Sequence, residues 1–82
     1  MNYKNKVLKA ARLSLDNSAK VAVHDSGRDF QKRYFITTDL TEIDAKEITE
    51  MEHRLSSDTE NFAVVGISVI DGGYIGLSVQ FF

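Results

Sequence analysis

The two histidines and their neighbours are the residues of this chain whose types could support catalysis. His24 is followed directly by Asp25 and Ser26, and the chain has no cysteine, which excludes thiolate nucleophiles, disulfides and zinc knuckles. Successive side chains of an extended strand point to opposite sides, so His24, Asp25 and Ser26 cannot form a proton relay. We therefore expect no catalytic residues in this segment.

His53 raises the question of a metal site, because Glu50 and Glu52 lie beside it in the sequence. Either pair would lack further ligands of the required type nearby, and a bound metal needs three or four. The only glycine pair, in Asp71–Gly73, joins two predicted strands and opens no helix, so it does not match a phosphate-binding loop. The sequence predicts no metal, no cofactor and no enzymatic activity.

Size and composition predict one globular domain spanning residues 1–82. A chain of this length buries roughly 60–65% of its unfolded surface, which leaves no room for a second core. Its 43% apolar and 27% charged residues are typical of a folded domain. No signal peptide is visible, and the longest apolar run, 62–65, is too short to span a bilayer. We expect a cytoplasmic protein without a membrane partner.

Apolar periodicity predicts two amphipathic helices. The first, over 2–16, ends at Asn17–Ser18 and leaves Leu13 on its outer face; its buried stripe is Tyr3, Val7, Leu8, Ala11 and Leu15. The second is expected to start at an N-cap formed by Thr41 with Asp44, or by Asp39 with Glu42, and to end at 56–58. Its predicted stripe is Leu40, Ile43, Ile48, Met51 and Leu55.

Alternating residues predict four strands. The first two are expected over 19–24 and 30–38, with a turn at 25–27. The run 62–82 is expected to be a hairpin whose apolar residues share one face: Ala63, Val65, Ile67, Val69, Ile75, Leu77, Val79 and Phe81. This requires Val69 to lie opposite Ile75. The loop is then Asp71–Gly73, with Gly73 in the left-handed conformation.

The predicted order is therefore α-β-β-α-β-β, which indicates an α+β two-layer sandwich. Both helices should cover one face of a four-stranded antiparallel sheet, since neither apolar stripe can be buried otherwise. One arrangement with this order is the ferredoxin-like sandwich with its first strand moved to the C-terminus, which puts the strand 74–82 in the middle of the sheet. A plain meander of hairpins is the alternative.

Charge is distributed unevenly along the chain. Up to Arg33, eight lysines and arginines outnumber three aspartates, whereas from Tyr34 onward Lys46 and Arg54 face nine carboxylates, so segments of net charge +5 and −7 are joined. Such asymmetry favours binding to charged partners over chemistry. Part of it needs no partner, since Glu42, Lys46, Glu50 and Arg54 alternate in sign at helical spacing.

The remaining carboxylates around the second helix give the preferred hypothesis. They could imitate a row of phosphates and engage the basic cleft of a host protein that handles nucleic acid; they are Asp39, Asp44, Glu47, Glu52, Asp58 and Glu60. In size and charge the chain is similar to small acidic inhibitors encoded by phages and mobile elements. This predicts a non-catalytic protein-binding module that acts as an inhibitor or modulator.

Two other surfaces are candidates. The hairpin register predicts a flat sheet face of small residues with aromatic borders, suited to docking or to a homodimer: Phe62, Gly66, Ser68, Tyr74, Gly76, Ser78 and Phe82. Direct nucleic-acid binding is the alternative function, with phosphate contacts from Lys6, Lys9, Arg12 and Arg33 beside Leu13, and support from Lys4, Lys20, Lys32, Tyr34 and Phe35. The pI of 5.6 argues against it. A third alternative is a structural subunit that oligomerises through its sheet.

Overall fold

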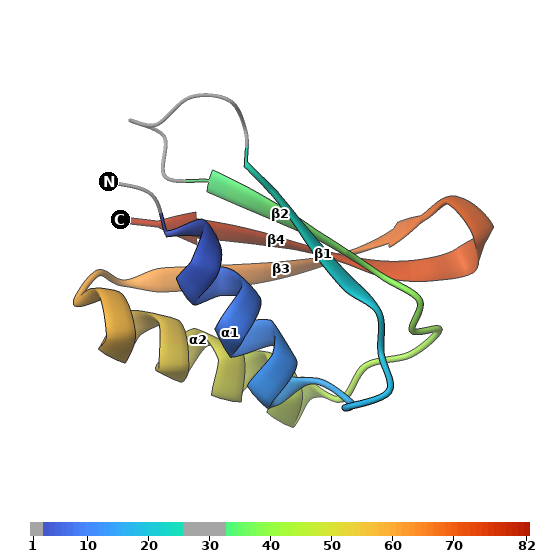
Figure 1. Cartoon of the computed structure of the whole chain (residues 1–82), viewed down its shortest axis with the longest axis horizontal. Coiled ribbons are helices and arrows are strands. Elements are labelled where there is room, and N and C mark those ends of the chain that lie inside the picture. Colours follow the sequence, from blue (N-terminus) through green and yellow to red (C-terminus); the bar gives the residue numbers. More distant parts are fainter. Residues whose placement is uncertain (1–2, 26–32) are drawn as a thin grey trace.

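The structure is a computed structural model that describes residues 3–25 and 33–82 (Figure 1). Its elements follow the predicted order: α1 (Lys4–Ser14), β1 (Val21–Asp25), β2 (Arg33–Thr38), α2 (Ala45–Thr59), β3 (Ala63–Ile70), a single 3-10 turn at Asp71–Gly73 and β4 (Tyr74–Phe81). Residues 26–27 of the predicted turn and residues 30–32 of the predicted second strand lie outside the described part.

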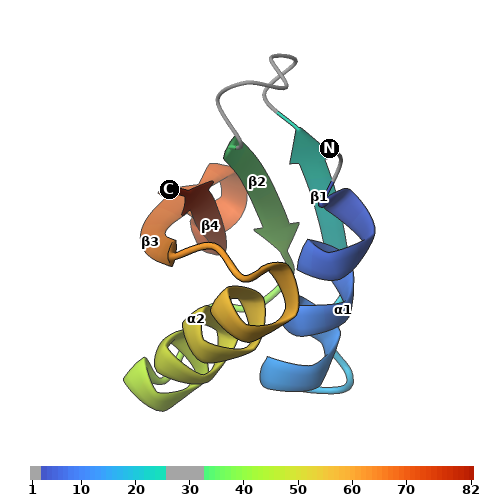
Figure 2. The same cartoon turned by 90° about the vertical axis from the view of Figure 1, so that its left-hand side faces the viewer.

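The strands form one antiparallel sheet in the order β1-β2-β4-β3. Both helices lie on the same side of this sheet, as Figure 2 shows. The C-terminal strand β4 is therefore central, and of the two alternatives left open by the sequence the order is the one that the permuted ferredoxin-like arrangement requires. A meander would place β3 beside β2, so that alternative is wrong.

The β3–β4 hairpin has the register derived from its apolar pattern. Val69 lies opposite Ile75, and a three-residue loop, Asp71–Gly73, joins the strands. Gly73 has a φ of 80°, which confirms the left-handed conformation expected of it, and Gly72, with a φ of 85°, adopts it too. Residues with a Cβ atom strongly disfavour positive φ values, so the two glycines make the short loop possible.

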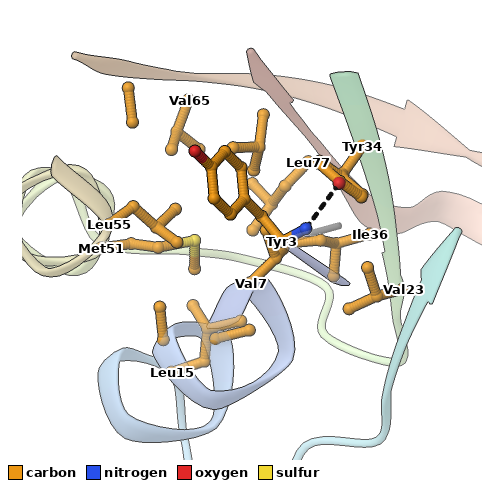
Figure 3. Close-up of a cluster of buried hydrophobic side chains, with 14 of the residues drawn as sticks. Tyr3, Val7, Leu15, Val23, Tyr34, Ile36, Met51, Leu55, Val65 and Leu77 are labelled. Atoms are coloured by element: carbon orange, nitrogen blue, oxygen red, sulfur yellow. Dashed lines mark hydrogen bonds between the residues drawn. The ribbon is translucent and has the colours of Figure 1, made fainter. Parts of the chain in front are cut away.

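Helix α1 is held to the sheet by its apolar stripe and by one buried hydrogen bond. Tyr3, Val7 and Leu15 point into the core between the layers (Figure 3). The backbone N–H of Tyr3, at the start of the helix, donates to the hydroxyl of Tyr34 on β2 over 2.8 Å. Phe81 packs against both rings, with centroids 4.9 Å from Tyr3 and 6.1 Å from Tyr34.

Helix α2 starts later than the sequence predicted. Asp44 is the N-cap: its carboxylate accepts the N–H of Lys46 over 3.0 Å, and the Glu47 carboxylate accepts the N–H of Asp44 in return. The predicted caps Thr41 and Asp39 are wrong, because the box Asp44–Glu47 satisfies the same spacing rule three residues further on. The predicted end at 56–58 is also wrong, since the helix continues to Thr59.

The segment before α2 is not helical and is tied to the sheet. The Leu40 carbonyl accepts the N–H of Ile75 over 2.7 Å, and the Thr38 hydroxyl bridges Leu40 N–H and the Ile75 carbonyl. Leu40 and Ile43 pack against the core from this segment instead of from a helix. This shortens the N-terminal end of the helix layer.

The helices leave part of β3 uncovered. Ile67 and Val69 lie on the helix side of the sheet, yet their exposed fractions are 54% and 73%. They share the face of Ala63 and Val65, as predicted, but are left uncovered because the hairpin extends beyond both helices (Figure 1). By contrast Ala63 and Val65, nearer the start of β3, are buried.

Candidate binding surfaces

The histidines lie on separate parts of the molecule. His24 is exposed on β1, where its Nε2 lies 3.3 Å from the Thr37 hydroxyl of the neighbouring strand. His53 is exposed on α2, in the other layer. Within residues 3–25 and 33–82, no group of three or more histidine, aspartate or glutamate side chains is placed to hold a metal ion. Neither histidine therefore belongs to such a group in this part of the chain.

The side of the sheet away from the helices, which we call the open sheet face, carries most of the exposed aromatic side chains. The aligned registers of all four strands place these residues on it: Ala22, His24, Arg33, Phe35, Thr37, Phe62, Val64, Gly66, Ser68, Ile70, Tyr74, Gly76, Ser78, Gln80 and Phe82. None of these described residues is an aspartate or glutamate. Arg33, whose Nη2 donates to the Gln80 side chain over 3.2 Å, is the one fixed positive charge among them.

The centre of the open sheet face differs from the bare patch that the sequence predicted. Ser68 pairs with Gly76, and Gly66 with Ser78, as derived. Gly76 is buried, however, because the side chains of Ile70 and Phe35 cover it. A Cβ atom at this position would lie 2.6 Å from Ile70 Cγ2 and 3.1 Å from Phe35 Cζ. Glycine at this position thus lets the side chains of Phe35 and Ile70 lie over the central strand, which is a structural reason for the small residue.

The end of the open sheet face next to the C-terminus carries a cluster of exposed apolar side chains. Phe62 and Phe82 are joined by a backbone hydrogen bond of 2.8 Å, and their ring centroids are 6.3 Å apart. Their exposed fractions are 68% and 64%, and Val64 beside them is also exposed. Two adjacent phenylalanines left in solvent are a costly feature, and such clusters mark interaction sites.

The predicted acidic surface is partly used inside the fold. Asp39 accepts the N–H of Lys20 over 2.8 Å, Asp44 and Glu47 form the capping box of α2, and Glu52 accepts the N–H of Val65 over 2.9 Å. Each of these carboxylates accepts a hydrogen bond from a backbone N–H. Charge reversal at these positions would therefore change stability as well as any binding.

Three other carboxylates near α2 are exposed without such a role. They are Glu42, in the segment before the helix, and Asp58 and Glu60, at its C-terminal end. The alternating series Glu42, Lys46, Glu50 and Arg54 is shorter than predicted, because Glu42 lies outside the helix. Within the described residues the series contains one ion pair, between Arg54 Nη2 and Glu50 Oε1 over 2.7 Å. The acidic groups are thus spread over both ends of α2 rather than aligned in one row.

The predicted nucleic-acid contacts are separated by the fold. Lys6, Lys9, Arg12 and Leu13 lie exposed on α1, in the helix layer, whereas Arg33 lies on the open sheet face. The Lys6 ammonium donates to the backbone carbonyl of Asp58 over 2.8 Å. Tyr34, which was expected to support base stacking, is buried with its hydroxyl bonded to Tyr3, so that prediction is wrong. Lys32 lies outside the described residues.

One carboxylate has a perturbed titration. The N–H of Ser18, and secondly its hydroxyl, both donate to Asp16 Oδ1 over 2.9 Å, and these bonds hold the pKa of Asp16 below its ordinary value of 3.8. The two bonds fix the turn that follows α1.

Comparison with protein-family models, with curated proteins and with solved structures found no match to this chain. No helix in the described ranges is long and apolar enough to cross a membrane. The assignment of a function therefore depends on the surfaces themselves.

Sequence reasoning missed two contributors to the open sheet face. Phe35 was considered only for base stacking, and Val64 was not considered. Both occupy strand positions that alternate with core residues, Tyr34 and Ile36 around Phe35 and Ala63 and Val65 around Val64. An apolar side chain at such a position, opposite to the core, was the available indication.

Proposed function

We propose that this protein is a non-catalytic protein-binding module that docks on a partner protein through the open sheet face. The observation that carries the proposal is the pair Phe62 and Phe82, both about two-thirds exposed on a face without acidic side chains in its described part. Phe35, Val64 and Tyr74 extend the apolar surface from this pair across the sheet.

A protein partner fits this face better than a nucleic acid does. Between the aromatic side chains lie neutral polar groups, Ser68, Ser78 and Gln80, and the described residues of this face include a single guanidinium, Arg33. A nucleic acid needs several cations beside its stacking platform, and the lysines of α1 are in the other layer. The partner surface that matches is flat and apolar at its centre, with a carboxylate placed to meet Arg33.

The narrower hypothesis, an inhibitor from a phage or mobile element that engages a nucleic-acid-handling host protein through the acidic surface, stays a prediction. The carboxylates that are free to make such contacts are Glu42, Asp58 and Glu60. They lie on the helix side, so this mode of binding and docking through the sheet use opposite sides of the molecule. Variants on each side therefore separate the two.

The test is an affinity capture from a cytoplasmic lysate, with and without nuclease, using the wild type and three variants. One variant combines Phe62→Ser with Phe82→Ser, the second neutralises the free carboxylates (Glu42→Gln, Asp58→Asn, Glu60→Gln), and the third is Leu13→Ser. Leu13 is the matched control, because it is an exposed apolar residue, 54% accessible, on the helix side.

We expect one stoichiometric protein that survives nuclease, that is lost with the phenylalanine variant and that is retained by the other two. The proposal is overturned if the phenylalanine variant captures the same protein as the wild type. Loss only with the carboxylate variant would instead support docking through the acidic surface, and recovery of nucleic acid would support the alternative function.

A further inference from the structure

Strand β3 is an edge of the sheet, and only half of that edge is covered. The bond from Phe82 N–H to the Phe62 carbonyl defines which residues of β3 face β4, because hydrogen-bonded and non-bonded pairs alternate along an antiparallel ladder. The backbone groups of Ala63, Val65, Ile67 and Val69 consequently point away from β4, toward the outside of the sheet.

Helix α2 satisfies the first two of these outward donors. Ser56 Oγ accepts the N–H of Ala63 over 3.1 Å, and Glu52 accepts the N–H of Val65 over 2.9 Å. Ser56 and Glu52 are four residues apart on α2, and the next position at this spacing is Ile48. The side chain of Ile48 has no atom that can accept a hydrogen bond. Among the described residues, nothing pairs with the outward N–H groups of Ile67 and Val69. We call residues 66–70 of β3 the free edge.

The side chains of the free edge are as unusual as its backbone. Ile67 and Val69 face the helix side but lie beyond the cover of α2, with 54% and 73% of their surface exposed. An exposed edge strand with apolar, β-branched side chains is a template for pairing with another strand. The edge carries no lysine, proline or inward charge that would prevent such pairing.

We propose that two copies of this chain associate by antiparallel pairing of their free edges about a two-fold axis at Ser68. In this register Ile67 of one copy lies opposite Val69 of the second copy, and each such pair exchanges both N–H···O bonds. All outward backbone groups of Ile67 and Val69 are then satisfied. The four exposed β-branched side chains of the two copies meet on the helix side and shield one another.

The length of the free edge matches this register. Residues 66–70 of one copy pair with 70–66 of the other, and the next residue of the second copy, Asp71, begins the hairpin loop. The second copy therefore leaves the edge opposite Val65 of the first copy. From Val65 onward that edge is occupied by Glu52 of the first copy. The sheets become continuous, with all helices on one side, and the open sheet face is left accessible, so this inference does not depend on the proposed function.

A single cysteine tests the register, because the chain has none of its own. Ser68 is exposed and lies on the axis in a non-hydrogen-bonded pair, where the two Cα atoms are about 4.5 Å apart, within the range for a disulfide. We expect Ser68→Cys to form a disulfide-linked dimer under mild oxidation. Ser78→Cys, an exposed position on the central strand β4, is the matched control and should stay largely monomeric.

Sedimentation of the full chain over a concentration series tests the association itself. We expect a reversible dimer for the wild type, a dissociation constant raised at least about tenfold by Val69→Lys, and little change with Val64→Lys on the open sheet face. Val69 is largely solvent-exposed, so the lysine variant should remain folded, which circular dichroism verifies.

A wild type that remains monomeric at millimolar concentration would overturn the proposal. So would dissociation caused by Val64→Lys but not by Val69→Lys, which would place the dimer on the open sheet face. Equal rates of disulfide formation by Ser68→Cys and Ser78→Cys would overturn the register.

Discussion

The hydrogen bond between Tyr3 N–H and the Tyr34 hydroxyl connects the start of α1 to the middle of the sheet. Deleting the hydroxyl oxygen of Tyr34 abolishes this bond. In Tyr34→Phe the ring keeps its packing against Phe81, 6.1 Å between centroids, but the buried Tyr3 N–H loses its acceptor. An unsatisfied buried donor costs about 1–3 kcal/mol. A domain of this size has a total stability of roughly 4–12 kcal/mol, so the loss is a large fraction of it.

The assay is urea unfolding followed by circular dichroism, with thermal unfolding beside it. We expect the free energy of unfolding to fall by about 1–3 kcal/mol, and the melting temperature to fall by about 4–8 °C for each kcal/mol. Tyr74→Phe is the matched control, since Tyr74 is exposed on the open sheet face, and its loss should be below about 0.5 kcal/mol. Equal midpoints for the two variants, with unchanged urea dependence, would refute the reasoning.

Two further predictions concern the helix ends. Asp44→Ala should lower the free energy of unfolding by about 1 kcal/mol through loss of the N-cap, whereas Thr41→Ala should leave it within about 0.5 kcal/mol; the reverse ranking in urea unfolding would show that α2 begins at the earlier cap. The pKa of Asp16 is lowered in the folded state, so its contribution to stability is present above the ordinary value of 3.8 and is lost as the pH falls through the folded pKa. Ser18→Ala, which removes only the hydroxyl donor, should raise the pKa of Asp16 part of the way back, and an unchanged carboxyl titration by NMR would contradict this assignment.

The hairpin register could be predicted because its determinants are local and redundant. Apolar residues alternate over the whole of β3 and β4, and only one register puts both sets on one face. Gly72 and Gly73 then permit the short loop. The central position of β4 could not be derived, because a meander would also bury the two helix stripes against one face of the sheet.

The start of α2 could not be predicted in the same way, because three acceptable caps lie within six residues. Leu40 and Ile43 continue the helical apolar spacing, so the pattern favours an earlier start. The competing interactions are tertiary: the Thr38 hydroxyl accepts the N–H of Leu40, the Leu40 carbonyl accepts the N–H of Ile75, and these bonds hold Leu40 in a non-helical segment. The exposure of Ile67 and Val69 was missed as well, because the length of the hairpin relative to the helices is a property of the packed structure.

The roles of the carboxylates were also beyond sequence reasoning. Glu52 and Glu60 have the same side chain, but the fold places a backbone donor next to Glu52: its carboxylate accepts the N–H of Val65 over 2.9 Å. A count of charges cannot distinguish a carboxylate that completes a backbone hydrogen bond from one that is free to meet a partner.

Hydroxyl-radical footprinting, with and without the captured partner, tests most directly whether a partner covers the open sheet face. We expect Phe62, Tyr74 and Phe82 to be protected in the complex, with Leu13 and His53 on the helix side reacting as in the free protein. Protection of His53 and the helix side, with the three aromatic residues unchanged, would contradict docking through the sheet.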